Sequence, residues 1–249
     1  MNLFEVWGIE PKYSYIGQTV TKKQFKQQIG VSSKDAQLID SDILKIKIAH
    51  GLNPQLININ PYNDGKYIFE GIMYLTVELK SKNEVKKVAQ LIHQNIPQPT
   101  FLILTEGDEC CLSSAIKRLN LNDNQSVIIE EFQVTKWMNL NKLSEVDKQF
   151  ILSLALSELP HHDFHEFYKA IQAKLYNLNH IDEIGEYEVT YSAKRQEEIQ
   201  GRVELIKEKE NQLNQLVLKL KKETQFNKKL SLNEQAMKLK KEIDELKNQ

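Results

Sequence analysis

The sequence contains little cysteine, little glycine and no long hydrophobic run. Its 249 residues include two cysteines and nine glycines. The cysteines are adjacent, Cys110 and Cys111, so they provide neither a disulfide framework nor a spaced thiolate pair for zinc. No stretch approaches the roughly 18 apolar residues of a membrane span, and the first residues lack a basic segment that leads into an apolar run. We therefore expect a cytoplasmic protein that makes no contact with membranes.

Two motifs that mark common enzyme classes are also missing. The sequence has no G-x-x-x-x-G-K loop to cradle phosphates, which argues against an autonomous nucleotide hydrolase. It has no G-x-S-x-G elbow to present a nucleophilic serine. These absences favour a protein without catalytic activity, and we expect no cofactor.

The composition is that of a folded protein with an uneven charge distribution. Apolar residues make up 41% and charged residues 27% of the chain, which argues against extended disorder. The net charge is −1, but residues 192–249 hold 14 Lys and Arg against 10 Asp and Glu. A basic C-terminal segment favours an acidic partner, either a nucleic acid or a protein.

The order of predicted elements indicates an α+β fold with a small antiparallel or mixed sheet and flanking helices. Residues 67–79 predict the clearest strand, Ser81 to Glu84 form a capping box that begins a helix, and further strands follow at residues 101–104, 110–116 and 127–134. Residues 21–29 predict a short helix and residues 56–59 a short strand. Helices from Ser144 to Pro160 and over residues 164–178 are expected to cover the sheet. We divide the chain into an α+β body at 1–140, a helical cap at 141–190 and a helical hairpin at 191–249.

The hairpin is predicted from apolar residues that alternate in steps of four and three, the pattern of a coiled coil. A second capping box at Ser231 and Glu234 places a break near residues 227–231. The same pattern serves a hairpin that folds back on itself or a broken helix that enters a dimer. The residues expected to bind a partner are Leu213, Val217, Leu220, Leu239, Ile243 and Leu246.

One motif is typical of magnesium-dependent nucleases. Glu78 and Lys80 form the E-x-K that restriction-type enzymes carry on a strand, and Asp64 is a possible second carboxylate ligand. Oxygen ligands and a lysine near the phosphate suit such hydrolysis, and magnesium would then be the cofactor. A solvated strand end explains the same residues, since E-x-K is common by chance.

Two further groups of residues have both a functional and an ordinary interpretation. His161 and His165 would share a helix face at four-residue spacing and bind a transition metal, although a helix N-terminus also recruits polar residues there. Lys221, Lys222, Lys228 and Lys229 would contact nucleic-acid phosphates, although solvated helix faces are often rich in lysine.

The C-terminal segment from Lys221 to Leu230, with Asn233, Glu234 and the run Leu239 to Glu242, has a recognisable pattern. Together with the N-terminal lead-in, residues 46–59 and residues 91–97, it resembles the bacterial domain-of-unknown-function 4391 family. The resemblance carries over no catalytic residue. It implies an accessory protein that accompanies helicases and DNA methyltransferases in antiphage-defence or restriction-modification-like gene clusters.

The leading hypothesis is an accessory interaction protein whose hairpin binds a helicase, a methyltransferase or a second copy of itself. The alternatives are a metal-dependent nuclease that uses Asp64, Glu78 and Lys80, and a nucleic-acid-binding module without catalysis.

Overall fold

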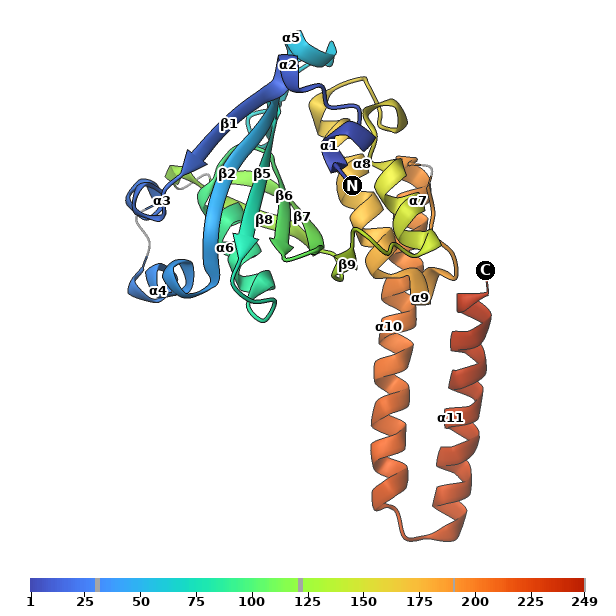
Figure 1. Cartoon of the computed structure of the whole chain (residues 1–249). Helices are drawn as coiled ribbons and strands as arrows, with labels where there is room; N and C mark the ends of the chain where they lie inside the picture. Colours follow the sequence, from blue (N-terminus) through green and yellow to red (C-terminus); the bar gives the residue numbers. More distant parts are fainter. Residues whose placement is uncertain (30–31, 121–122, 190, 249) are drawn as a thin grey trace. The chain divides into compact units, whose positions relative to one another are not determined.

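The computed structural model describes residues 1–29, 32–120, 123–189 and 191–248 (Figure 1). It divides into two compact units, Met1–Asn179 and His180–Gln249. The first unit holds a mixed sheet with flanking helices, and the second holds a C-terminal pair of long helices. The predicted α+β class is therefore confirmed. The segment predicted as a helical cap, residues 141–190, is shared between the two units.

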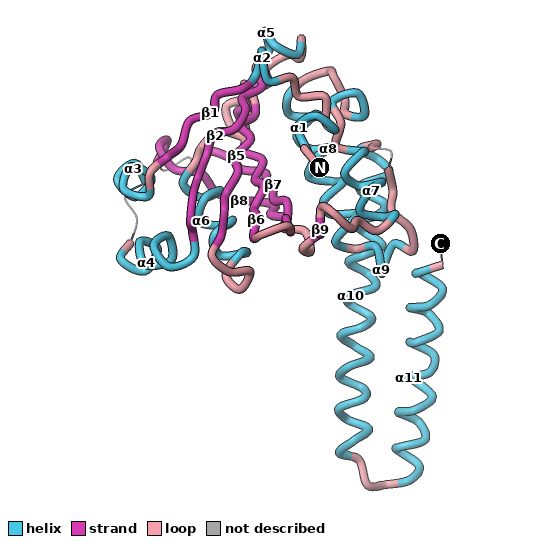
Figure 2. The backbone as a smooth tube through the Cα atoms, in the orientation of Figure 1, coloured by secondary structure: helices cyan, strands magenta, loops and turns pink. Residues whose placement is uncertain are grey.

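The described part of the first unit forms a seven-stranded sheet. Its strands are β1 (Tyr15–Val20), β2 (Ile43–Leu52), β5 (Ile72–Leu79), β6 (Thr100–Glu106), β7 (Glu109–Asn120), β8 (Asp123–Val134) and β9 (Met138–Asn139). The spatial order is β1-β2-β5-β6-β7-β8, and β9 pairs with β7 (Figure 2). β5 and β6 are parallel and are joined by helix α6 (Val85–Asn95), while the other pairs are antiparallel. A separate small hairpin consists of β3 (Tyr62–Asn63) and β4 (Ile68–Phe69).

The helices of the first unit are mostly short. They are α1 (Leu3–Val6), α2 (Pro11–Ser14), α3 (Lys22–Ile29), α4 (Ser33–Asp42), α5 (Pro54–Ile57), α7 (Glu145–Ser153), the 3-10 turn η1 (Leu156–Glu158) and α8 (Phe164–Asn179). The second unit contains α9 (Ile181–Ile184), α10 (Ala193–Lys222) and α11 (Phe226–Lys247). The helix predicted over residues 21–29 corresponds to α3, and the helix predicted over residues 164–178 corresponds to α8.

Two neighbouring serines of β7 show how helices cover the sheet. Ser113 Oγ lies 3.0 Å from Nε2 of His93 on α6, whereas the Ser114 hydroxyl donates to Oε1 of Gln172 on α8 at 2.5 Å. Successive side chains of a strand point to opposite faces. Helices α6 and α8 therefore pack against opposite faces of the sheet.

Each face has its own core. On the α6 face, Val77 and Leu104 of neighbouring strands pack with Ile92 and with Phe25 of α3. On the other face the core is aromatic, and the ring centroids of Trp7 and Phe101 are 5.6 Å apart. The Trp7 indole also donates to the carbonyl oxygen of Ile151 on α7 at 3.0 Å. Burial on both faces explains why the central strands contain nearly continuous apolar residues.

One strand prediction is confirmed with an interruption, and another is wrong. The strand predicted over residues 67–79 corresponds to β4 and β5, which are separated at Glu70 and Gly71. At this point the two backbones pass so close that a Cβ on Gly71 would lie 2.5 Å from the carbonyl oxygen of Leu52. In the segment predicted as a strand at residues 56–59, Leu56 and Ile57 are instead the last two residues of helix α5. The Asn53 side chain caps this helix by accepting from the amides of Gln55 and Leu56.

Both predicted capping boxes are also absent from their predicted places. Helix α6 starts at Val85, and its N-cap residue Glu84 makes no side-chain cap, so Ser81 lies before the helix. A full capping box is present at Ser144, whose hydroxyl accepts from the amide of Asp147 while the Asp147 carboxylate accepts from the Ser144 amide.

In the second unit, the break between the long helices comes earlier than predicted. Helix α10 ends at Lys222 and α11 begins at Phe226, so Ser231 lies within α11. The Glu223 carboxylate accepts from the amides of Thr224 and Gln225 at 2.8 and 2.9 Å. These bonds lower the pKa of Glu223 and satisfy amide donors where the new helix begins.

Candidate functional site

The two long helices fold back on each other within the chain (Figure 1). Lys209 donates to Glu242 at 2.6 Å, and Lys247 donates to Glu210 at 2.8 Å. Glu210 lies between Ile206 and Leu213, at the one position of α10 where the alternation of apolar residues in steps of four and three is interrupted. An ion pair across the hairpin therefore takes the place of an apolar contact at this position.

The predicted seam is covered unevenly. Ile243 is 4% exposed, but Val217 is 36% exposed. The other residues predicted to bind a partner are partly exposed: Leu213, Leu220, Leu239 and Leu246. In a pair of helices each seam has one neighbouring helix, so part of it stays open to solvent.

A second apolar surface lies on α11, and the sequence did not predict it. Phe226, Leu230 and Met237 are 77%, 51% and 66% exposed. Their spacings of four and seven residues place them within about 40° of one another around a helix, well away from the seam. We call these three residues the α11 stripe. The break placed at residues 227–231 concealed it, because Phe226 and Leu230 then lay outside the helix.

The tip of the hairpin is basic. Lys221, Lys222, Lys228 and Lys229 are all exposed. A surface hollow of about 470 Å³ lies beside them, and its lining includes Lys219, Lys222 and Lys228 together with Glu223. The predicted basic patch therefore exists as a surface, and its ligand stays a prediction.

The residues of the nuclease alternative do not come together. Glu78 is opposite Thr105 of β6, which is in turn opposite Cys110 of β7. The turn that carries Asp64 lies at the other end of β7, where the amide of Leu119 donates to the carbonyl oxygen of Lys66 at 3.0 Å. The nine residue steps from Cys110 to Leu119 correspond to about 30 Å of strand.

The contacts of Asp64 and Lys80 also give no support to the nuclease alternative. Asp64 Oδ1 accepts from the amides of Lys66 and Tyr67, and these backbone hydrogen bonds lower the pKa of Asp64. The Lys80 side chain donates to the carbonyl oxygen of Asp40 at 2.8 Å. These side chains serve turns and strand ends, so the nuclease alternative stays a prediction without support from their positions.

The two candidate histidines do not share a helix face, because α8 begins at Phe164 and His161 precedes it. His165 stacks between two tyrosines, with ring centroids 4.5 Å from Tyr62 and 5.6 Å from Tyr67. Burial lowers the pKa of His165. Asp163 accepts from the amide of Glu166 at 2.8 Å, so the polar residues after Pro160 begin the helix, as the ordinary interpretation predicted.

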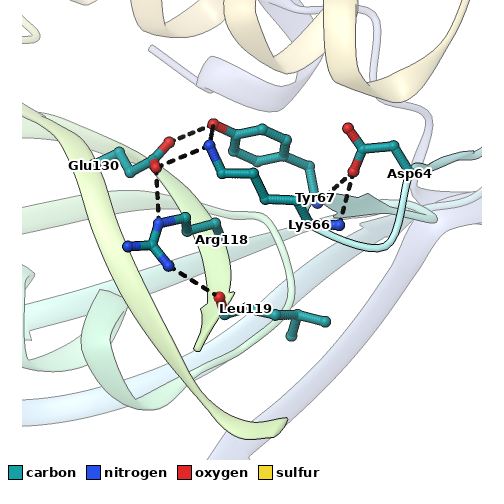
Figure 3. Close-up of polar contacts among 6 residues, drawn as sticks. All are labelled: Asp64, Lys66, Tyr67, Arg118, Leu119 and Glu130. Carbon is teal, nitrogen blue, oxygen red and sulfur yellow. Dashed lines mark hydrogen bonds and ion pairs between the residues drawn. The ribbon is translucent and has the colours of Figure 1, made fainter. Parts of the chain in front are cut away.

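A charged cluster joins the β3–β4 hairpin to the sheet (Figure 3). Glu130 of β8 accepts from the Tyr67 hydroxyl and pairs with Lys66 at 3.2 Å and with Nε of Arg118 at 2.9 Å. The hydrogen bonds from Tyr67 and Lys66 lower the pKa of Glu130. Both carboxylate oxygens are engaged, so the cluster anchors the hairpin and is a poor candidate for acid–base chemistry.

Across the described ranges, no group of three His, Cys, Asp or Glu side chains is arranged to hold a metal ion. In the same part of the chain, no helix is both long and apolar enough to cross a membrane.

A family model with the description "domain of unknown function (DUF4391)" matches residues 10–243, nearly the whole chain. The chain belongs to this family. The suspected family resemblance is therefore confirmed. Searches among curated proteins and among solved structures found no match for this DUF4391 member.

Proposed function

We propose that this DUF4391 protein is an accessory interaction component of a bacterial antiphage-defence or restriction-modification-like system. In this proposal the protein acts in the cytoplasm, and the hairpin of α10 and α11 docks onto a helicase or DNA methyltransferase. The observation that carries the proposal is the α11 stripe. The family resemblance supplies the class of partner.

The stripe favours docking because its three large apolar side chains are exposed and lie on one side of α11. Single apolar residues on a surface are ordinary, but three large ones aligned on one helix face favour a contact with another protein. A helix that presents residues at such spacings suits an apolar groove on its partner. Phe226 is the expected anchor, since aromatic side chains contribute strongly at the centre of interfaces.

The charge of the hairpin indicates what surrounds that groove. Residues 211–237 contain five lysines and two glutamates. Positive charge at the rim of an interface speeds association with an acidic surface. We infer a partner whose apolar groove has an acidic border.

The test compares two triple-alanine variants in a pull-down from the native host. The first removes the stripe through Phe226→Ala, Leu230→Ala and Met237→Ala. The control, Ser231→Ala, Gln235→Ala and Lys238→Ala, changes three exposed residues on another side of the same helix. Alanine maintains the helix in both variants.

We expect the stripe variant to lose at least about tenfold in affinity for the recovered helicase or methyltransferase, because interface anchors each contribute more than 1 kcal/mol. The control variant should bind like the wild type. Equal recovery of the partner by both variants would contradict docking through the stripe.

A nucleic-acid-binding module is the second candidate, favoured by the exposed lysines at the hairpin tip. It predicts DNA or RNA affinity that falls steeply with salt and drops when Lys221, Lys222, Lys228 and Lys229 are neutralised. The stripe variant would retain this binding, so the two proposals are distinguishable.

A further inference from the structure

A cleft of about 560 Å³ lies in the first unit, beside the ends of the strands where β2 finishes and β5 begins. Sites for small organic molecules fall in a range of about 300–1,000 Å³. The described residues that line the cleft all belong to the first unit.

The walls of this cleft are mostly apolar. They include Leu56, Ile68 and Leu119 from three different elements. At the mouth, Tyr15 and Ile16 are 54% and 48% exposed, although both are large apolar side chains. When an apolar ligand covers such a surface, apolar area is removed from water, and this favours binding.

Local contacts fix the shape of the cleft before any ligand binds. At its floor, Gly71 passes so near to Leu52 that no side chain fits between the two backbones. One wall is the segment from Pro97 to Pro99, where the carbonyl oxygen of Gln98 accepts from the buried Lys117 amine at 2.7 Å. A preformed site requires little ordering when a ligand enters.

A single carboxylate gives the cleft its chemical character. Among the described residues that line it, Glu70 is the one charged side chain. Glu70 is exposed and directly follows β4, where it lines the cleft beside the apolar walls. An apolar ligand in the cleft therefore lies beside one carboxylate.

We propose that this cleft binds a small organic cation, an apolar molecule that carries one protonated amine. The apolar body occupies the space between Ile16, Ile68 and Leu119, and the amine lies against Glu70. This proposal is independent of the partner of the hairpin.

The test uses two fluorescent probes of nearly equal size and titrates each into the full-length protein. N-dansylcadaverine carries an apolar ring system and a terminal ammonium group. N-pentyl dansylamide has the same ring system and chain length without the charge. We expect saturable binding of both, with the amine about three- to fivefold tighter, as an exposed ion pair provides.

Three variants assign this preference to the cleft. Glu70→Gln should abolish the preference for the amine while retaining binding of the neutral probe. Ile16→Lys should weaken binding of the amine further, because it places a cation at the mouth. Glu145→Gln is the matched control, since Glu145 is an exposed carboxylate on α7 outside the cleft and should leave both affinities unchanged.

The positions changed are exposed in the structure, so each variant is expected to fold, and its circular dichroism spectrum checks this. The proposal is overturned if neither probe shows saturable binding, if the two probes bind equally to the wild type, or if Glu70→Gln and Ile16→Lys leave the preference for the amine unchanged.

Discussion

The side-chain nitrogen of Lys117 lies 2.6 Å from the carbonyl oxygen of Ile96, the residue that ends helix α6. The same nitrogen donates to the carbonyl oxygen of Gln98 at 2.7 Å. Lys117 is 6% exposed, and burial lowers its pKa to about 7. The amine thereby links strand β7 to the connection between α6 and β6.

The pKa of Lys117 predicts a pH-dependent stability. The ordinary lysine value is 10.5, so between pH 7 and 10.5 the unfolded chain holds more protons at this position than the folded protein. Burial of Lys117 therefore makes the wild type more stable as pH rises, by at most about 5 kcal/mol over that range. Lys117→Met lacks this titration, so its free energy of unfolding relative to the wild type should fall with rising pH.

Urea unfolding at several pH values between 7 and 10 measures this difference. Lys45→Met is the control, because it removes a lysine that is exposed on β2 in place of the buried one. Parallel pH curves for Lys117→Met and the wild type would show that burial does not shift the titration of Lys117.

The close approach at Gly71 predicts a large difference between two glycine substitutions. Gly71→Ala places a Cβ 2.5 Å from a backbone oxygen that cannot move alone, and we expect it to lower the free energy of unfolding by about 2 kcal/mol. Gly201→Ala lies in α10 with open space around the new Cβ and should stabilise by up to about 1 kcal/mol. Urea midpoints that move in the same direction for both variants would be inconsistent with this geometry.

Two serines that look alike in the sequence are expected to differ in their effect on stability. Ser144→Ala removes a full capping box and should lower the free energy of unfolding by about 1 kcal/mol. Ser81→Ala should change it little, because α6 begins at Val85 without a side-chain cap. Equal losses, measured by thermal unfolding, would mean that Ser81 caps α6 in solution.

Most of the fold follows from local sequence patterns, and the exceptions have physical causes. The strands over residues 101–104 and 110–116 were predicted because both segments are short and apolar, and in the structure they pair as neighbouring antiparallel strands. The interruption at Gly71 was missed, because a glycine within a strand pattern does not by itself show where the strand stops, and the close approach to Leu52 is a tertiary contact.

The candidate site was predicted only in part. The seam of the hairpin followed from its periodicity, but the α11 stripe was missed because α11 begins at Phe226, before the break predicted near residues 227–231. The start of α11 is marked by the Glu223 carboxylate, which accepts from the next two amides, and this differs from the S-x-x-E pattern of a capping box. The cleft beside Glu70 depends on several distant segments, so spacing along the sequence could not reveal it.

The most direct test of the accessory role is a pull-down of the tagged full-length protein from its own host, followed by measurement of the mass of the complex in solution. We predict a complex that contains a helicase or DNA methyltransferase, with a mass equal to the sum of its components, and that is lost in the stripe variant. Recovery of only a monomer or homodimer would contradict the account.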